Sequence, residues 1–233
     1  MNFTAFFYIF NSLMEKWLKP IFTLLFGAAV WLFWWLVFPQ ALGFKEQNQL
    51  FLFTADFLFE RLSVPGRFAE WLSDFITQFN HIIWLGALLN GVIFTVIQTL
   101  VWQIAGKIGK GRYDVWYPLS FILPTAILCI LGDMYVTTGF VMATLLALAL
   151  SRVFLSRKST AFALAAVPAA FWLIGPAASI FVFIYMISGK GKALRRIIAG
   201  MALSAAALIL FHYVLAVQYP WRQLLLGINY YQI

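Results

Sequence analysis

The feature that most constrains this chain is a series of long apolar runs separated by short basic loops. A helix needs roughly 20 apolar residues to cross a hydrocarbon layer of about 30 Å. Only 10% of the residues are charged, against about a quarter in soluble domains. The sequence therefore predicts an all-α polytopic transmembrane bundle, with residues 1–233 forming a single membrane domain. Four runs approach or exceed the length of a membrane-crossing helix: 21–42, 82–104, 115–131 and 134–151.

Basic residues cluster between the runs and predict the orientation of the chain. In membrane proteins Lys and Arg accumulate in cytoplasmic loops, where they also contact anionic lipid headgroups. The turn Gly132-Asp133 is acidic and is therefore expected outside. The net charge of +8 is explained by the membrane, so nucleic acid is not an expected partner. Ten residues are predicted to orient the chain and to contact headgroups: Lys107, Lys110, Arg112, Arg152, Arg157, Lys158, Lys190, Lys192, Arg195 and Arg196.

The N-terminal residues are expected to lie on the membrane and not to cross it. Residues 3–18 place apolar side chains on one helical face, with Asn11, Glu15 and Lys16 on the other. Lys19-Pro20 follows, and proline disrupts helical hydrogen bonding. The pattern predicts an interfacial helix over residues 1–20 that ends before the first span.

The apolar stretch 160–188 is long for one span and has basic residues on both sides. Gly175-Pro176 lies at its centre, where proline cannot continue the helical hydrogen-bond ladder. We favour a short helical hairpin that goes out and returns over one tilted helix. With a last span near 197–217, the hairpin gives seven spans, a cytoplasmic N-terminus and an outer C-terminus. A single tilted helix gives six spans with both ends inside.

The segment 44–81 joins the outer ends of the first two spans and combines many phenylalanines with many charges. Acidic residues outnumber basic ones in it, which also favours an outer position. Pro65-Gly66 divides it into two helical halves, the second of which has Glu70 and Asp74 opposite an aromatic face. We predict two juxtamembrane helices in the outer interface, with an acidic stripe directed to water or to a cavity. A solvated helix face without further function is the alternative.

The run EQNQLFLFTADFLFERLSVPGRFAEWLSDFITQF and the tail PWRQLLLGINYY resemble an uncharacterised family of bacterial integral membrane proteins. The resemblance covers essentially the whole chain and implies a bacterial inner-membrane protein, with no assigned activity. Members of that family continue into a soluble region. The resemblance therefore implies that an outer soluble domain or partner protein complements this chain.

A second resemblance, in architecture, is to the GT-C class of membrane glycosyltransferases. There an acidic residue follows the first span, and the first outer loop forms two juxtamembrane helices. The resemblance implies sugar transfer from a polyprenyl-phosphate donor, with Glu46 as the base and Asp133 orienting the acceptor or a divalent ion. Arg61 or Arg67 would bind the phosphate. Where that class has an Asp-Glu or Asp-Asp pair, this chain has the sequence KEQ, so no metal or other cofactor is expected.

Three functions remain open at this point. A non-catalytic membrane scaffold or assembly partner is favoured, and a GT-C-like glycosyltransferase is the main alternative. A transporter is a further alternative, although the spans contain few ionisable residues, which transport pathways usually carry.

Overall fold

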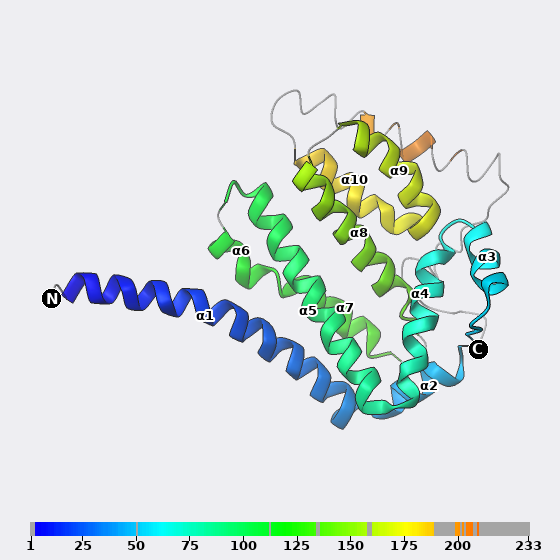
Figure 1. The fold of residues 1–233 in the computed structure, drawn as a ribbon, viewed down its shortest axis with the longest axis horizontal. Coiled ribbons are helices and arrows are strands. Elements are labelled where there is room, and N and C mark those ends of the chain that lie inside the picture. Colours follow the sequence, from blue (N-terminus) through cyan, green and yellow to red (C-terminus); the bar gives the residue numbers. More distant parts are fainter. Residues whose placement is uncertain are drawn as a thin grey trace.

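The computed structural model describes residues 3–49, 51–111, 113–133, 136–157 and 160–188, together with positions 199–200, 202, 204–206 and 209. Every element in the described part is a helix, which confirms the all-α prediction (Figure 1). The apolar runs also predicted a multi-pass membrane protein, and the helices have the required length and composition. Within the described residues, five segments can cross a membrane by these criteria: Trp17–Val37, Ile83–Ile108, Tyr113–Leu131, Gly139–Ser156 and Ala165–Ile187.

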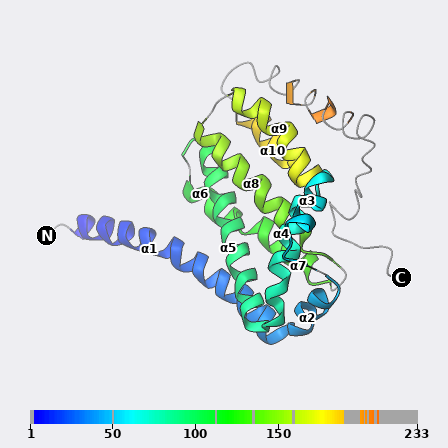
Figure 2. The ribbon, with the colours of Figure 1, turned by 45° about the vertical axis from the view of Figure 1, so that its right-hand side comes forward.

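The first helix, α1 (Phe3–Leu32), is continuous and contains Pro20. The predicted helix end at residue 20 is therefore wrong. A proline removes a single backbone donor, and membrane helices tolerate this where neighbouring groups or local adjustments satisfy the carbonyl that is left free. A π-helical turn, η1 (Phe33–Val37), extends α1, so the first candidate span begins and ends earlier than predicted. In both views the N-terminal part of α1 extends away from the other helices (Figures 1 and 2).

The segment 44–81 forms short helices, as predicted. Pro65-Gly66 separates two of them, and Gly66 adopts φ +88°, a left-handed conformation that favours glycine. The second of these helices packs against α8 and α9, so it belongs to the bundle and does not only coat its surface. The elements are α2 (Pro39–Gln47), α3 (Ala55–Ser63), α4 (Arg67–Thr77) and the 3-10 turn η2 (Gln78–His81).

The central span is α5 (Ile83–Ile108), which contacts α1, α6, α7 and α8. Gly91 allows α1 to approach closely, because a Cβ at this position would lie 2.8 Å from the carbonyl oxygen of Gly27. Small residues at helix crossings are typical of membrane bundles. The pair α1 and α5 therefore forms the framework on which the other spans pack.

The third candidate span consists of two helices, α6 (Tyr113–Leu119) and α7 (Ile122–Leu131), where one was predicted. Pro124 explains the break, since it has no N–H for the carbonyl of Ser120 and its ring crowds that carbonyl. The fourth span, α8 (Gly139–Arg157), is uninterrupted.

The predicted hairpin over 160–188 is present. Helices α9 (Thr160–Ile174) and α10 (Ala178–Ile187) pack against each other and against α8, joined by the turn η3 (Gly175–Ala177). Gly175 has φ +60° at the bend. At 1.5 Å per residue the arms measure only about 22 Å and 15 Å, less than a hydrocarbon layer of about 30 Å. The predicted last span, 197–217, lies largely outside the described residues.

Candidate functional site

A half-buried ion-pair cluster joins α3 to α4 in the segment between the first two candidate spans. The Arg61 guanidinium on α3 lies 3.3 Å from Glu70 Oε2 and 3.3 Å from Asp74 Oδ2, both on α4. Arg67 Nε lies 3.9 Å from the same oxygen of Glu70. The side chains of Glu70 and Asp74 are only 25% and 12% exposed. The α4 part of the acidic stripe, which was expected to face water or a cavity, is therefore turned inward against Arg61, whereas Asp56 and Glu60 on α3 are exposed.

Desolvation dominates the electrostatics of the two carboxyl groups. Burial raises the pKa of Asp74 to about 6, while Arg61 lowers it and the neighbouring Glu70 raises it. Burial also raises the pKa of Glu70, against the opposing effects of Arg67 and Arg61. One guanidinium shared between two carboxylates compensates only part of the cost of removing them from water. The strength of the α3–α4 connection therefore depends on pH.

Helix α4 faces the bundle with small and hydroxyl-bearing side chains. Ser73 and Thr77 are buried and hydrogen-bond to Thr138, just before α8, with 3.1 Å between the Thr77 and Thr138 hydroxyls. This polar face allows α4 and α8 to pack closely. The aromatic side chains of α4 lie on the opposite side. There Phe68, Trp71 and Phe75 form one aromatic cluster with Phe79 of η2 and with Phe51 and Phe53 from the stretch before α3.

Lys45 is a buried cation that the sequence analysis did not identify as a site residue. It is 4% exposed, and its Nζ donates to the carbonyl oxygen of Leu131 over 2.8 Å. The same Nζ lies 5.3 Å from the ring centroid of Trp34, which is fully buried in the π-helical turn. Burial lowers the pKa of Lys45 to about 7, and Asp133 acts in the opposite direction. Lys45 thus fastens α2 to the turn after α7.

The hydrogen bond from Lys45 to Leu131 places the end of α2, which carries Glu46, next to the turn that carries Asp133. Asp133 acts electrostatically on Lys45, and Glu46 follows Lys45 at the end of α2. Glu46 is half-buried and Asp133 is exposed. The predicted phosphate ligands, Arg61 and Arg67, are paired with the acids of α4 instead. Within the described ranges, no group of three or more His, Cys, Asp or Glu side chains could hold a metal ion.

The predicted orienting residues whose side chains the structure describes, Lys107, Lys110 and Arg152, gather at one end of the bundle. Lys107 Nζ lies 3.2 Å from Ser156 Oγ, and Arg152 Nε donates to Gln103 Oε1 over 2.6 Å, so the ends of α5 and α8 meet. Lys110 lies in the turn after α5 and is exposed. This grouping agrees with the predicted placement of these loops on one side. Six of the other predicted positions lie outside the described residues: Arg112, Lys158, Lys190, Lys192, Arg195 and Arg196. For Arg157 the structure describes the backbone but not the side chain.

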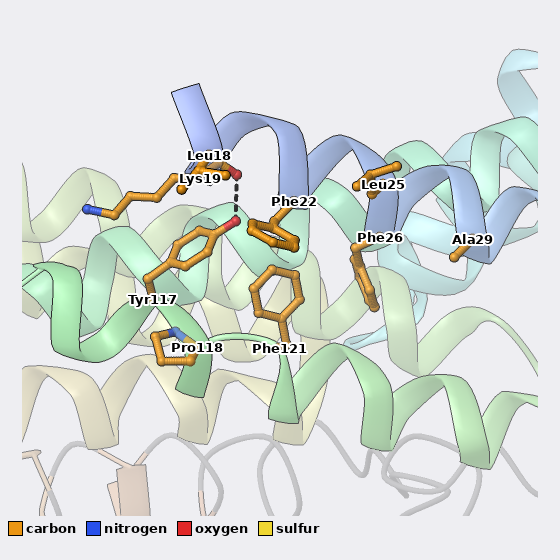
Figure 3. Close-up of a pocket in the computed structure, with 9 residues that line it drawn as sticks. All are labelled: Leu18, Lys19, Phe22, Leu25, Phe26, Ala29, Tyr117, Pro118 and Phe121. Atoms are coloured by element: carbon orange, nitrogen blue, oxygen red, sulfur yellow. Dashed lines mark hydrogen bonds between the residues drawn. The ribbon is translucent and has the colours of Figure 1, made fainter. Parts of the chain in front are cut away.

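A wide apolar groove separates α1 from α6 and α7 at this same end. Its volume is about 720 Å³, within the range of small-molecule pockets. Phe22 and Phe26 of α1 point toward Phe121, and the Phe26 and Phe121 rings meet edge to face with 5.2 Å between their centroids (Figure 3). Tyr117 lies at one end, where its hydroxyl donates to the carbonyl oxygen of Lys19 over 2.5 Å. Both walls belong to candidate membrane spans.

The sequence matches a family of unknown function, DUF6057, over residues 14–233. The chain belongs to the DUF6057 family. This confirms the resemblance to an uncharacterised family, and the match includes the ion-pair cluster, Lys45 and the groove. No curated protein and no solved structure matches the chain.

Behind the groove of this DUF6057 protein, polar side chains connect α1, α5 and the α6–α7 span. Gln98 is fully buried in α5, donates to Ser120 Oγ over 2.7 Å and accepts from Thr23 Oγ1 over 3.2 Å. The Thr23 and Tyr117 hydroxyls are 2.9 Å apart. Hydrogen bonds between helices are expected for polar side chains buried in a membrane. These contacts hold α1 and α6 at a fixed separation, and the groove lies beside them.

Proposed function

We propose that this protein is a non-catalytic membrane scaffold whose bundle holds the α3–α4 layer in place for a partner protein or soluble domain on the outer side. The observation that carries the proposal is the engagement of Arg61 with both Glu70 and Asp74. A glycosyltransferase would need such a cation for the departing phosphate. In this protein it fixes α3 on α4, and the ionisable groups of the outer segment therefore serve architecture.

The distribution of ionisable residues in the spans supports a scaffold over a transporter. In the five candidate spans of the described residues, each ionisable residue lies no more than five residues from a span end. Transport pathways usually carry ionisable side chains at depth in the membrane. The residues concerned are Lys19, Lys107, Asp114 and Arg152.

The proposed location is the bacterial inner membrane, with the basic end of the bundle in the cytoplasm. The hairpin of α9 and α10 then enters from the cytoplasmic side and returns to it, because neither arm is long enough to cross. Four full crossings, this re-entrant hairpin and the predicted last span give a cytoplasmic N-terminus and an outer C-terminus. Membrane-impermeant thiol labelling tests this topology: Cys in place of Asp133 should react from outside and Cys in place of Lys110 only from the cytoplasm.

A GT-C-like glycosyltransferase is the second candidate, and one contact favours it. The hydrogen bond from Lys45 to Leu131 brings the end of α2 to the turn that carries Asp133. Under this alternative Glu46 is the base, Asp133 orients the acceptor, and the donor is a polyprenyl-phosphate-linked sugar. Arg61 would then have to leave Glu70 and Asp74 to bind the phosphate.

Complementation of a deletion strain separates the two candidates. A scaffold predicts that the double variant Glu46→Gln/Asp133→Asn, produced at the normal level, restores the wild-type surface glycans and growth. A photoreactive residue at Phe59 on α3 should give a discrete protein adduct, and one at Leu36 on the first span should not, although their exposures match at 66% and 64%. Altered glycans in the double variant, without an adduct at Phe59, would establish the enzyme instead.

A further inference from the structure

We infer that the groove between α1 and the α6–α7 span is a binding site for one anionic phospholipid. An acyl chain lies along the apolar wall that Phe22, Leu25 and Phe121 form, and the headgroup phosphate lies at Lys19. This site is separate from the outer segment, so it does not depend on the scaffold function.

The position of the groove determines the class of occupant. Its walls belong to the candidate spans Trp17–Val37 and Tyr113–Leu131, and apart from Lys19 and the Tyr117 hydroxyl its lining is apolar. In a bilayer the material available to fill such a space is hydrocarbon or the helix of another protein. A polar substrate would gain no hydrogen bonds along these walls.

The sizes of the lining side chains favour an acyl chain over a helix. Membrane helices associate where Gly, Ala, Ser or Thr let two backbones approach. Among the lining residues only Ala29 is of this kind, while Phe22, Leu25 and Phe26 project from the same face of α1. Such an irregular wall leaves no flat surface for a second backbone, whereas a flexible chain can follow it.

The charge at one end of the groove favours an anionic headgroup. Lys19 lies beside Tyr117, and its ammonium points past the end of the groove (Figure 3). Its side chain is 20% exposed and pairs with Asp114, whose side chain is 66% exposed. Lys107 and Lys110 belong to the same end of the bundle and add to the positive potential. A lipid phosphate meets a cation there while its acyl chain enters the groove.

Native mass spectrometry after reconstitution tests the site. The full chain is placed in vesicles of equal parts phosphatidylglycerol and phosphatidylcholine and is then extracted into mild detergent. The wild type should retain one phosphatidylglycerol per chain. Ala29→Trp and Leu25→Trp, which fill the groove, should lose it, whereas Val92→Phe should retain it, because Val92 is an exposed position of α5 outside the groove.

Two further variants test the headgroup. Lys19→Met should reduce the preference for phosphatidylglycerol over phosphatidylcholine about fivefold, since a lysine near an anionic lipid surface contributes about 1 kcal/mol. Asp114→Asn should increase that preference by removing the competing carboxylate.

Retention of lipid by both Trp variants at the wild-type level would overturn the site. The site would also be overturned if the wild type formed a dimer without bound lipid and the Trp variants were monomers. That result would assign the groove to a second copy of the chain. An unchanged preference in Lys19→Met would overturn the anionic specificity.

Discussion

The backbone N–H of Gly66 donates a hydrogen bond to the carbonyl oxygen of Trp172 over 2.6 Å. In return the Trp172 indole N–H donates to the carbonyl oxygen of Leu62 over 3.0 Å. The hinge between α3 and α4 is thereby attached to the end of α9, directly before the bend of the hairpin. Helices α3 and α4 and the hairpin, which are distant in the sequence, thus stabilise each other inside one bundle.

Gly66→Ala should destabilise the protein by about 1 kcal/mol, because an L-residue at φ +88° is strained. The apparent melting temperature in detergent should fall accordingly. Gly43→Ala is the control, since a Cβ at position 43 meets no atom within 4 Å and Gly43 lies within helix α2. That variant should be neutral or slightly more stable. Equal melting temperatures for the two variants would contradict the role of the left-handed conformation.

The apolar segments and the hinge could be predicted from the sequence because they follow from local rules. Hydrophobic run length identified the spans, and Pro65-Gly66 and Gly175-Pro176 each end a helix as their backbone chemistry requires. The effects of other prolines depend on context. Pro20 is accommodated within α1, whereas Pro124 lies four residues after a break between two helices. Local rules do not distinguish these two cases.

Which face of α4 is buried could not be predicted, because periodicity defines two faces without naming their neighbours. The interfacial hypothesis placed the acids of α4 toward water or a cavity. The structure places Glu70 and Asp74 against Arg61, a residue of the preceding helix. Lys45, by contrast, did leave a signal in the sequence. It lies four residues after Ala41 and three after Leu42, both buried, so it shares the buried face of α2.

Arg61→Met should destabilise the protein far more than Arg67→Met. Loss of the Arg61 guanidinium leaves the buried Asp74 without its cation and Glu70 with the more distant Arg67 alone, at a cost of roughly 2 kcal/mol near pH 7.5. Arg67 is 44% exposed and lies 3.9 Å from Glu70, so its removal should have little effect. Chemical or thermal unfolding of both variants in the same detergent provides the comparison. Similar losses in the two variants would show that Arg61 does not hold the cluster together.

Asp74 should make the protein more stable as the pH falls from about 6.5 toward 4. Its pKa is raised to about 6 in the folded state, from an ordinary value of 3.8. Between these values the folded chain binds a proton that the unfolded chain releases, so acid favours folding by up to about 1.4 kcal/mol per pH unit. Arg61, Arg67 and Glu70 are the charged groups that face the site.

The variant Asp74→Asn tests this linkage. It should remove most of the acid stabilisation and should be more stable than the wild type at pH 7. The residual slope should come from Glu70, whose pKa is shifted in the same direction. Melting temperatures of the wild type and the variant from pH 4.5 to 7.5 provide the test. Parallel curves for the two proteins would rule out Asp74 as the titrating group.

Lys45 should produce the opposite slope at higher pH. Burial lowers its pKa to about 7 from 10.5, so above pH 7 the unfolded chain binds a proton that the folded chain lacks. Stability therefore rises with pH, again by up to about 1.4 kcal/mol per unit. Together with Asp74, this places a minimum of stability between about pH 6 and 7, where both side chains are charged and desolvated.

Lys45→Met keeps the apolar stem of the side chain and removes the charge. This variant should lose the rise in melting temperature between pH 7 and 9, and the double variant Lys45→Met/Asp74→Asn should lose most of the minimum. Lys107→Met is the matched control, because Lys107 lies at the other, basic end of the bundle and contacts Ser156. It should keep the wild-type profile. If Lys45→Met also keeps that profile, Lys45 is not the group that titrates near pH 7 in the folded protein.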